Sequence, residues 1–124
     1  MNVIFNRFDL RLWRIAWFGC LISILALSLV PNPASLMLEA GWDKSNHALA
    51  FFVLGILSLI AFPGSAWRVT AGLSGYGALI EVLQGMTAYR TAEWQDLIAD
   101  MIGIVAAIGV IAVMRRRNAS LAES

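Results

Sequence analysis

The fold is decided by residues 92–114, AEWQDLIADMIGIVAAIGVIAVM, which are followed directly by Arg115-Arg116-Arg117. A bilayer core of ~30 Å needs ~20 mostly apolar residues in a helix, and this stretch has that length and composition. The three arginines are typical of the charged end of a membrane-spanning segment. We therefore predict a transmembrane helix over 92–114.

Three more apolar stretches precede this one, and they predict spans over 15–30, 43–62 and 66–86. Proline-containing breaks end the first at residues 31–33 and the second at residues 63–64. The 124-residue chain is 60% hydrophobic and 14% charged, with a mean hydropathy of +0.75, which disfavours a water-facing globule of this size. We predict an all-α membrane protein, a four-transmembrane-helix bundle with one membrane domain over 15–114.

Residues 1–14 are predicted to form a separate amphipathic segment on the cytoplasmic surface. Phe5, Phe8 and Leu12 are spaced i, i+3 and i+7, so they share one helical face. The apolar stretch that follows also resembles a secretory signal. Trp13 and Trp17 flank it as interfacial anchors do, and its length exceeds a typical signal core, so we predict a retained first span.

The distribution of basic residues predicts the orientation. On this division of the chain, seven arginines lie on one side of the membrane, whereas Lys44 and Arg90 lie on the other; the seven are Arg7, Arg11, Arg14, Arg68, Arg115, Arg116 and Arg117. Positive residues accumulate on the cytoplasmic side of membrane proteins. We therefore expect both termini in the cytoplasm, with residues 115–124 as a basic tail.

Ionisable and amide side chains cluster in the predicted outer half of the bundle, at helical spacings that give each helix one polar stripe. They are Asp43 and His47 (i, i+4), Glu81 and Gln84 (i, i+3), and Glu93, Asp96 and Asp100 (i, i+3, i+7). At ~1.5 Å per residue these stripes reach a common depth. Small residues at Gly55, Gly77 and Gly103 predict close helix packing, with the stripes facing inward.

Some of these charges have a purely local explanation. Asp43, Glu93 and Asp96 lie near helix N-termini, which favour acids, and Arg90 follows a helix C-terminus, which favours bases. Glu81 and Asp100 lie more than a turn inside their spans, where a carboxylate costs at least ~2.5 to 3.5 kcal/mol. We interpret these two as parts of a functional site.

The charge balance restricts the chemistry of this cluster. Five acids give minus five, and Lys44 and Arg90 give plus two, which leaves minus three with His47 neutral. Either some carboxylates hold protons, or a cation or a cationic ligand lies among them. Mg²⁺ or Ca²⁺ suits carboxylate ligands, with Glu81, Asp96 and Asp100 as the candidates. A single His, together with Cys20 in the first apolar stretch, disfavours a structural zinc site.

Several motifs in this order resemble the VanZ-like family of small bacterial membrane proteins. They are Asp43-Lys44-x-x-His47, Ala50-Phe51-Phe52-x-x-Gly55, Glu81-x-x-Gln84, Arg90, and Asp96 before a glycine-bearing last span. Asp100 stands where the family pattern usually has Asn. The resemblance implies a bacterial cytoplasmic membrane setting, with a site facing the cell envelope. The family is named for a member associated with low-level resistance to the glycopeptide teicoplanin.

We predict an outward pocket that binds or modifies a lipid-linked sugar, a polymer headgroup or a glycopeptide. His47, Glu81 and Asp96 are the candidate catalytic residues, and the candidate ligand-binding residues are Asp43, Lys44, Gln84, Arg90 and Asp100. A proton-coupled lipid carrier or flippase, and a non-catalytic accessory subunit of an envelope assembly, stay open as alternatives. The sequence has no Ser or Cys nucleophile motif, phosphate-binding glycine loop or nucleic-acid signature. The resemblance implies an envelope lipid or glycan as partner, besides the bilayer.

Overall fold

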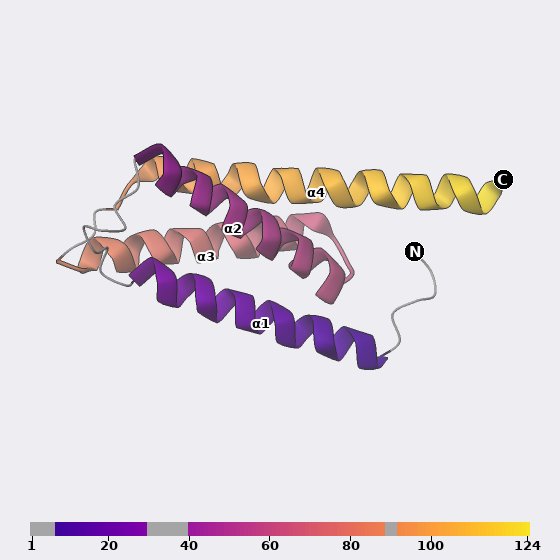
Figure 1. Cartoon of the computed structure of the whole chain (residues 1–124), viewed down its shortest axis with the longest axis horizontal. Helices are drawn as coiled ribbons and strands as arrows, with labels where there is room; N and C mark the ends of the chain where they lie inside the picture. The colour runs from indigo at the N-terminus through magenta and orange to yellow at the C-terminus, as the bar shows by residue number, and fades with distance from the viewer. Residues whose placement is uncertain (1–6, 30–39, 89–91) are drawn as a thin grey trace.

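The protein is all-helical across the part of the chain that its computed structural model describes, which is residues 7–29, 40–88 and 92–124. The helices are α1 (Arg7–Leu29), α2 (Ala40–Ala61), α3 (Ala66–Met86) and α4 (Trp94–Glu123). Consecutive helices run in opposite directions, so the start of α1 and the end of α4 lie at the same end of the molecule (Figure 1). The all-α prediction is confirmed.

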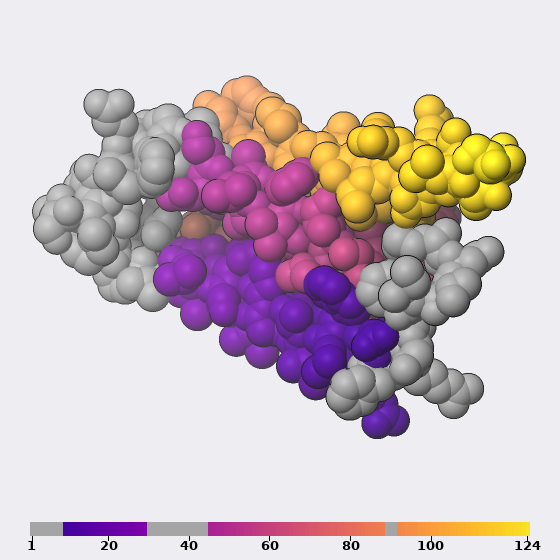
Figure 2. Space-filling view, turned by 45° about the vertical axis from the view of Figure 1, so that its right-hand side comes forward, coloured from indigo at the N-terminus to yellow at the C-terminus, as the bar shows by residue number. Residues whose placement is uncertain are grey.

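Two helices extend beyond the predicted spans. The first helix begins at Arg7, so residues 7–14 are helical and continuous with the predicted first span. This stretch contains neither Pro nor Gly, and Asp9 lies in the first turn, where a helix dipole favours an acid. The last helix likewise continues through residues 115–123, since its arginines, alanines and leucine are good helix formers. In Figure 2 this end of α4 projects beyond α2.

Two helices are long and apolar enough to cross a membrane by length and composition, over Asp9–Leu29 in α1 and within Trp94–Glu123 in α4. The apolar part described in α2, Ser45–Ala61, is shorter. Many large apolar side chains on α1 and α4 are exposed, including Ile15 at 67% and Val105 at 61%. Such surfaces are suited to lipid contact. Crossing by α2 and α3 stays a prediction of the sequence.

The closest helix pair is α2 with α4, and glycine makes it possible. A Cβ atom at Gly55 would lie 2.7 Å from the Cβ of Ala107, and one at Gly103 would lie 2.8 Å from the backbone nitrogen of Phe52. No side chain fits at these points, so the backbones approach closely, as at small-residue interfaces in membranes. The packing role predicted for these two glycines is confirmed.

Hydrogen bonds connect the first helix to the bundle, near the end of the molecule where α1 begins and α4 ends. Trp17 Nε1 donates to Ser58 Oγ at 2.7 Å, Arg14 Nε donates to the Ala61 carbonyl at 3.1 Å, and the Tyr76 hydroxyl donates to the Leu21 carbonyl. These bonds connect α1 to α2 and α3. The helix that resembled a signal is therefore an integral part of this fold.

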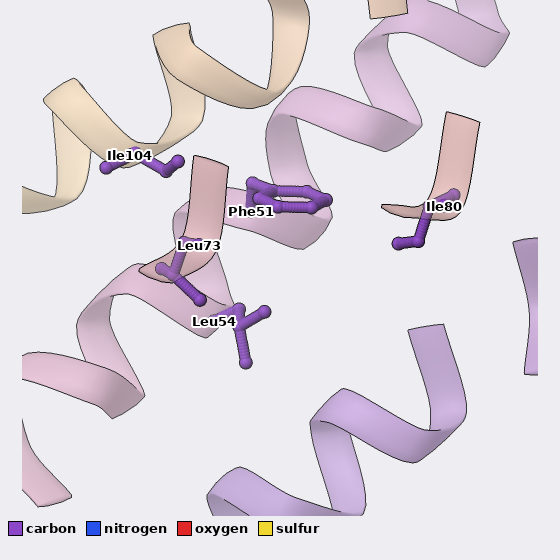
Figure 3. Packing of buried hydrophobic residues seen from close by; sticks show 5 residues of the cluster. All are labelled: Phe51, Leu54, Leu73, Ile80 and Ile104. Carbon is purple, nitrogen blue, oxygen red and sulfur yellow. The ribbon is translucent and has the colours of Figure 1, made fainter. Parts of the chain in front are cut away.

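The apolar core comes from α2, α3 and α4 and lies directly beneath the polar cluster. Its buried side chains are Phe51, Leu54, Leu73, Ile80 and Ile104 (Figure 3). Phe51 and Ile104 each follow a polar residue of the cluster, His47 and Asp100, by one helical turn. Close packing of this core fixes the three helices, and so fixes the polar side chains above it.

Candidate functional site

The centre of the candidate site is a buried pair between α2 and α4. His47 Nδ1 lies 3.0 Å from Asp100 Oδ1, and the residues are 8% and 1% exposed. A carboxylate oxygen at this distance accepts a hydrogen bond from Nδ1, which places the ring proton there and leaves Nε2 as an acceptor or metal ligand. The assignment of the tautomer follows from the bonding pattern. Asp100 therefore orients His47.

Asp96 lies one turn before Asp100 on α4 and faces the other nitrogen of the same ring. Its Oδ2 is 3.7 Å from His47 Nε2, and the residue is 4% exposed. This separation is longer than a hydrogen bond, so Asp96 acts on Nε2 through its charge or through a third group between them. The imidazole of His47 thus lies between two carboxylates of one helix face.

Glu81 brings a third carboxylate from α3. It is 5% exposed, and its Oε2 accepts a hydrogen bond of 2.8 Å from the backbone nitrogen of Glu93, at the N-cap position of α4. One ligand atom each from His47, Glu81 and Asp96 lie within 4.8 Å of one another. The common depth expected from helix geometry is found.

Glu81 Oε1 and Asp100 Oδ2 are buried carboxylate oxygens that have no hydrogen-bond partner among the described residues. Buried polar atoms in folded proteins are normally paired, because an unpaired one costs ~1 to 3 kcal/mol or more if charged. These two oxygens therefore suit a site that takes up a further group. Gly77 contributes space here, because a Cβ atom at that position would lie 2.7 Å from Asp100 Oδ2.

A pocket of about 600 Å³ lies next to this cluster. Its apolar wall comes from α1 and α2 and includes Ile24, Leu27, Leu49 and Val53, while its polar groups are Ser28, Asn46, His47 and Gln84. His47 lines the pocket and also belongs to the acid cluster. The pocket thus has an apolar wall and one polar end that contacts the cluster through His47.

Gln84 closes the polar end of this pocket toward α1. Its Nε2 donates a 2.9 Å hydrogen bond to the Ser28 carbonyl of α1. Ile24, four residues before Ser28, packs on the core. The residue is 2% exposed, so little of it faces open solvent. The predicted ligand-binding residue therefore also connects α3 to α1.

The structure brings some of the predicted site residues together, and other predicted site residues lie outside the part that it describes. His47, Glu81, Asp96 and Asp100 come together and Gln84 lies beside the pocket. The side chains of Asp43 and Lys44, and all of Arg90, lie outside the described residues. The divalent-cation set predicted from sequence, Glu81, Asp96 and Asp100, differs from the set within 4.8 Å, in which His47 takes the place of Asp100.

Sequence reasoning missed the contributions of α1 and of backbone groups. Ser28, Ile24 and Leu27 line the pocket, and the Glu93 amide binds Glu81. No chemical signature marks apolar residues as pocket lining, because the same residues also suit a lipid-facing surface. The Glu93 contact has a weak signal, since a helix N-terminus offers free amides to any carboxylate within reach.

No curated protein and no solved structure matches this chain. A family model described as VanZ/LLP1 matches residues 3–115 and so covers all of α1, α2 and α3 and most of α4. The match includes the whole polar cluster and the pocket beside it. With an all-helical fold and two helices suited to crossing a membrane, the chain belongs to the VanZ/LLP1 family.

Proposed function

We propose that this protein binds or modifies a lipid-linked ligand of the cell envelope, with the hydrocarbon chain between α1 and α2 and the polar group at His47. The observation that carries the proposal is the connection of two features at one residue. His47 belongs to a buried acid cluster and also lines the polar end of an apolar pocket. A ligand with an apolar chain and a reactive or ionic head matches both.

The pocket dimensions support a lipid. Its volume of about 600 Å³ is within the range of small-molecule sites, ~300 to 1,000 Å³. Its wall residues Leu49 and Val53 are 61% and 43% exposed on the α2 surface, so an apolar chain can reach it from the bilayer. Free sugars and polymers would gain little from these apolar walls, whereas a lipid anchor gains from each buried methylene.

The cluster supports proton transfer at the head of such a ligand. With Asp100 accepting from Nδ1, His47 Nε2 can take a proton from a ligand hydroxyl or phosphate. Asp96 faces that nitrogen and would stabilise the imidazolium that forms. Glu81 supplies a further carboxyl group for proton donation or ligand contact. The positions of His47, Glu81 and Asp96 therefore allow the catalytic roles that we propose for them.

Continuous helices favour a fixed binding site over a carrier. Transporters of the discontinuous-helix type build their sites from unwound segments at the membrane midplane. Here α2, α3 and α4 are each helical through His47, Glu81 and Asp100. The cluster also lies toward one end of the bundle, at the α3–α4 connection where the Glu93 amide binds Glu81.

We further propose that the protein is a multi-pass protein of the bacterial cytoplasmic membrane with the cluster toward the envelope. Ser45 and Ser65 are exposed residues at opposite ends of the bundle. With Cys20 changed to Ser, Ser45→Cys should react with a membrane-impermeant thiol reagent in intact cells, and Ser65→Cys only after lysis. Labelling of Ser65→Cys with protection of Ser45→Cys would reverse the orientation and exclude an envelope-facing site.

Photolabelling tests the lipid site directly. The full-length protein in nanodiscs is irradiated with a polyprenyl phosphate that carries a photoreactive group in its chain, and labelled peptides are mapped by mass spectrometry. We expect labels on Leu27, Leu49 and Val53. Val53→Trp should lower labelling about tenfold, because an indole occupies the pocket.

The matched control is Val110→Trp on α4. Val110 is 42% exposed and Val53 is 43% exposed, but Val110 does not line the pocket. Labelling should therefore be unchanged in this variant. A diacyl phospholipid carrying the same photoreactive group tests whether any bilayer lipid serves. Equal loss in both tryptophan variants, or labels spread evenly over the exposed faces of α1 and α4, would contradict the proposal.

A further inference from the structure

We infer that His47, Glu81 and Asp96 bind one divalent transition-metal ion of the Mn²⁺ or Zn²⁺ type, with Asp100 positioning the histidine. The inference is independent of lipid binding, since a metal can be bound whether or not a lipid occupies the pocket, but a metal bond at His47 Nε2 would take the place of the proton transfer proposed for that nitrogen. It differs from the sequence-based expectation in the ligand set and in the metal. It rests on the geometry of the three ligand atoms and of the oxygens around them.

The three ligand atoms already lie within reach of a common ion. They are all within 4.8 Å of one another, and His47 Nε2 and Asp96 Oδ2 are 3.7 Å apart. Two ligands at ~2.0 to 2.2 Å from a tetrahedral ion lie about 3.4 Å apart. Side-chain movements of about 1 Å bring the set to that geometry. The ligands come from α2, α3 and α4, and close packing of the core fixes the backbones of these helices.

Asp100 occupies the outer position that carboxylates take around metal-bound histidines. Its Oδ1 receives the Nδ1 proton at 3.0 Å, which directs the Nε2 lone pair toward Asp96. Metal-bound histidines almost always donate their other ring proton to a carboxylate, carbonyl or water.

Glu81 provides a second, independent observation. It is 95% buried, since 5% of its surface is exposed, and only Oε2 has a partner, while Oε1 has none among the described residues. A metal bond would satisfy an oxygen that no described group satisfies. Three buried acids, Glu81, Asp96 and Asp100, lie in this cluster.

The donor set selects the kind of metal. One imidazole nitrogen with two carboxylates suits Mn²⁺, Fe²⁺ or Zn²⁺, whereas Ca²⁺ and Mg²⁺ prefer all-oxygen ligands. Three protein ligands also leave coordination positions for water or a ligand head, as in catalytic sites. Such an ion would place a positive charge at the polar end of the pocket, where His47 lines it.

The test uses the full-length protein in detergent, stripped with EDTA and then dialysed against Mn²⁺ or Zn²⁺. We expect one bound ion per chain by elemental analysis, a dispersed Mn²⁺ spectrum by electron paramagnetic resonance, and a raised melting temperature with added ion. Mg²⁺ and Ca²⁺ should bind at least ~10-fold more weakly. Binding of Ca²⁺ or Mg²⁺ as tight as that of Mn²⁺ would overturn the assigned ligand set.

Substitutions distinguish residues that bind the metal from residues that only lie near it. His47→Gln, Glu81→Gln and Asp96→Asn should each weaken Mn²⁺ binding at least ~100-fold, and Asp100→Asn ~10-fold to 100-fold because it acts through His47. Glu93→Gln is the matched control, since it removes a nearby acidic side chain but keeps the backbone amide that donates to Glu81, and it should change binding less than threefold.

Helix content by circular dichroism and gel-filtration profile establish that each variant is folded. If folded His47→Gln and Glu81→Gln bind Mn²⁺ as wild type does, or if stripped wild type takes up less than a tenth of an ion per chain, the inference is wrong. Photolabelling of the stripped wild type by the lipid probe is measured in parallel, so that failure of the metal site and failure of the lipid site are read separately.

Discussion

Gly103→Val is expected to lower the melting temperature of the purified protein by about 10 °C or more, the largest stability effect of any single change here. A Cβ atom at Gly103 meets the carbonyl oxygen of Ala48 and the backbone nitrogen of Phe52, at the closest helix pair. Backbone atoms cannot rotate away, so α2 and α4 must separate. Overpacking of this kind costs ~1 to 3 kcal/mol or more, and each ~1 kcal/mol shifts the melting temperature by several degrees in a chain of this size.

Gly109→Val on the same helix is the control. A Cβ atom at Gly109 has no heavy atom within 4 Å, so only the general helix propensity changes there. Thermal unfolding of both variants followed by circular dichroism in one detergent gives the comparison. Similar melting temperatures for the two variants would show that α2 and α4 do not pack through Gly103.

His47→Ala is expected to remove the cellular function completely while the fold is kept. His47 is the only histidine of the chain, and in the structure it connects the acid cluster to the pocket. Its loss leaves Asp100 and Asp96 without the imidazole between them. The measurement is complementation of a deletion strain, with glycopeptide susceptibility as the first phenotype, together with the melting temperature of the purified variant.

Two conservative variants show whether the cluster is a site or only packing. Glu81→Gln should keep the fold and lose function, because it keeps the shape and removes the carboxylate. Asp100→Asn should be as stable as wild type or more so, since Asn Oδ1 can still accept from His47 and a buried charge is gone. If function in these variants and in His47→Ala declines only in proportion to melting temperature, the cluster is structural.

Retained activity in folded, well-expressed His47→Ala and Glu81→Gln would rule out the proposed site altogether. Asp100→Asn then adds a distinction between mechanisms. A site that works by proton transfer alone should keep most of its activity with Asn, which holds His47 in place. A metal-dependent site should lose affinity for its ion and, with it, activity at limiting metal.

The helices themselves could be predicted from local sequence. Pro63-Gly64 ends the second helix, and the third runs from Ala66 to Met86, the same bounds that the pattern predicted. The ends of α1 and α4 could not be predicted as well. An apolar stretch marks where a membrane ends, not where a helix ends, and helix-forming residues 7–14 and 115–123 continue past that boundary.

The polar cluster was predicted from spacing and from the cost of burying charge. Glu81 and Asp100 lie deep in apolar stretches where a carboxylate is costly, and His47 lies at the matching depth. Periodicity fixes which residues share a face of one helix, but it does not fix how two helices are rotated against each other. The sequence therefore predicted that His47, Glu81, Asp96 and Asp100 come together, and not how they pair.

The sequence by itself determined the helical class, the family and four buried ionisable residues, His47, Glu81, Asp96 and Asp100, because hydropathy and helical periodicity are local properties of the chain. Only the tertiary structure decided that Asp100 orients His47, that Glu81 receives the Glu93 amide, and that α1 provides the wall of a pocket. These depend on helix rotation and depth, which packing at Gly55, Gly77 and Gly103 sets. Contacts between helices are long-range, so they emerge only when the core is packed.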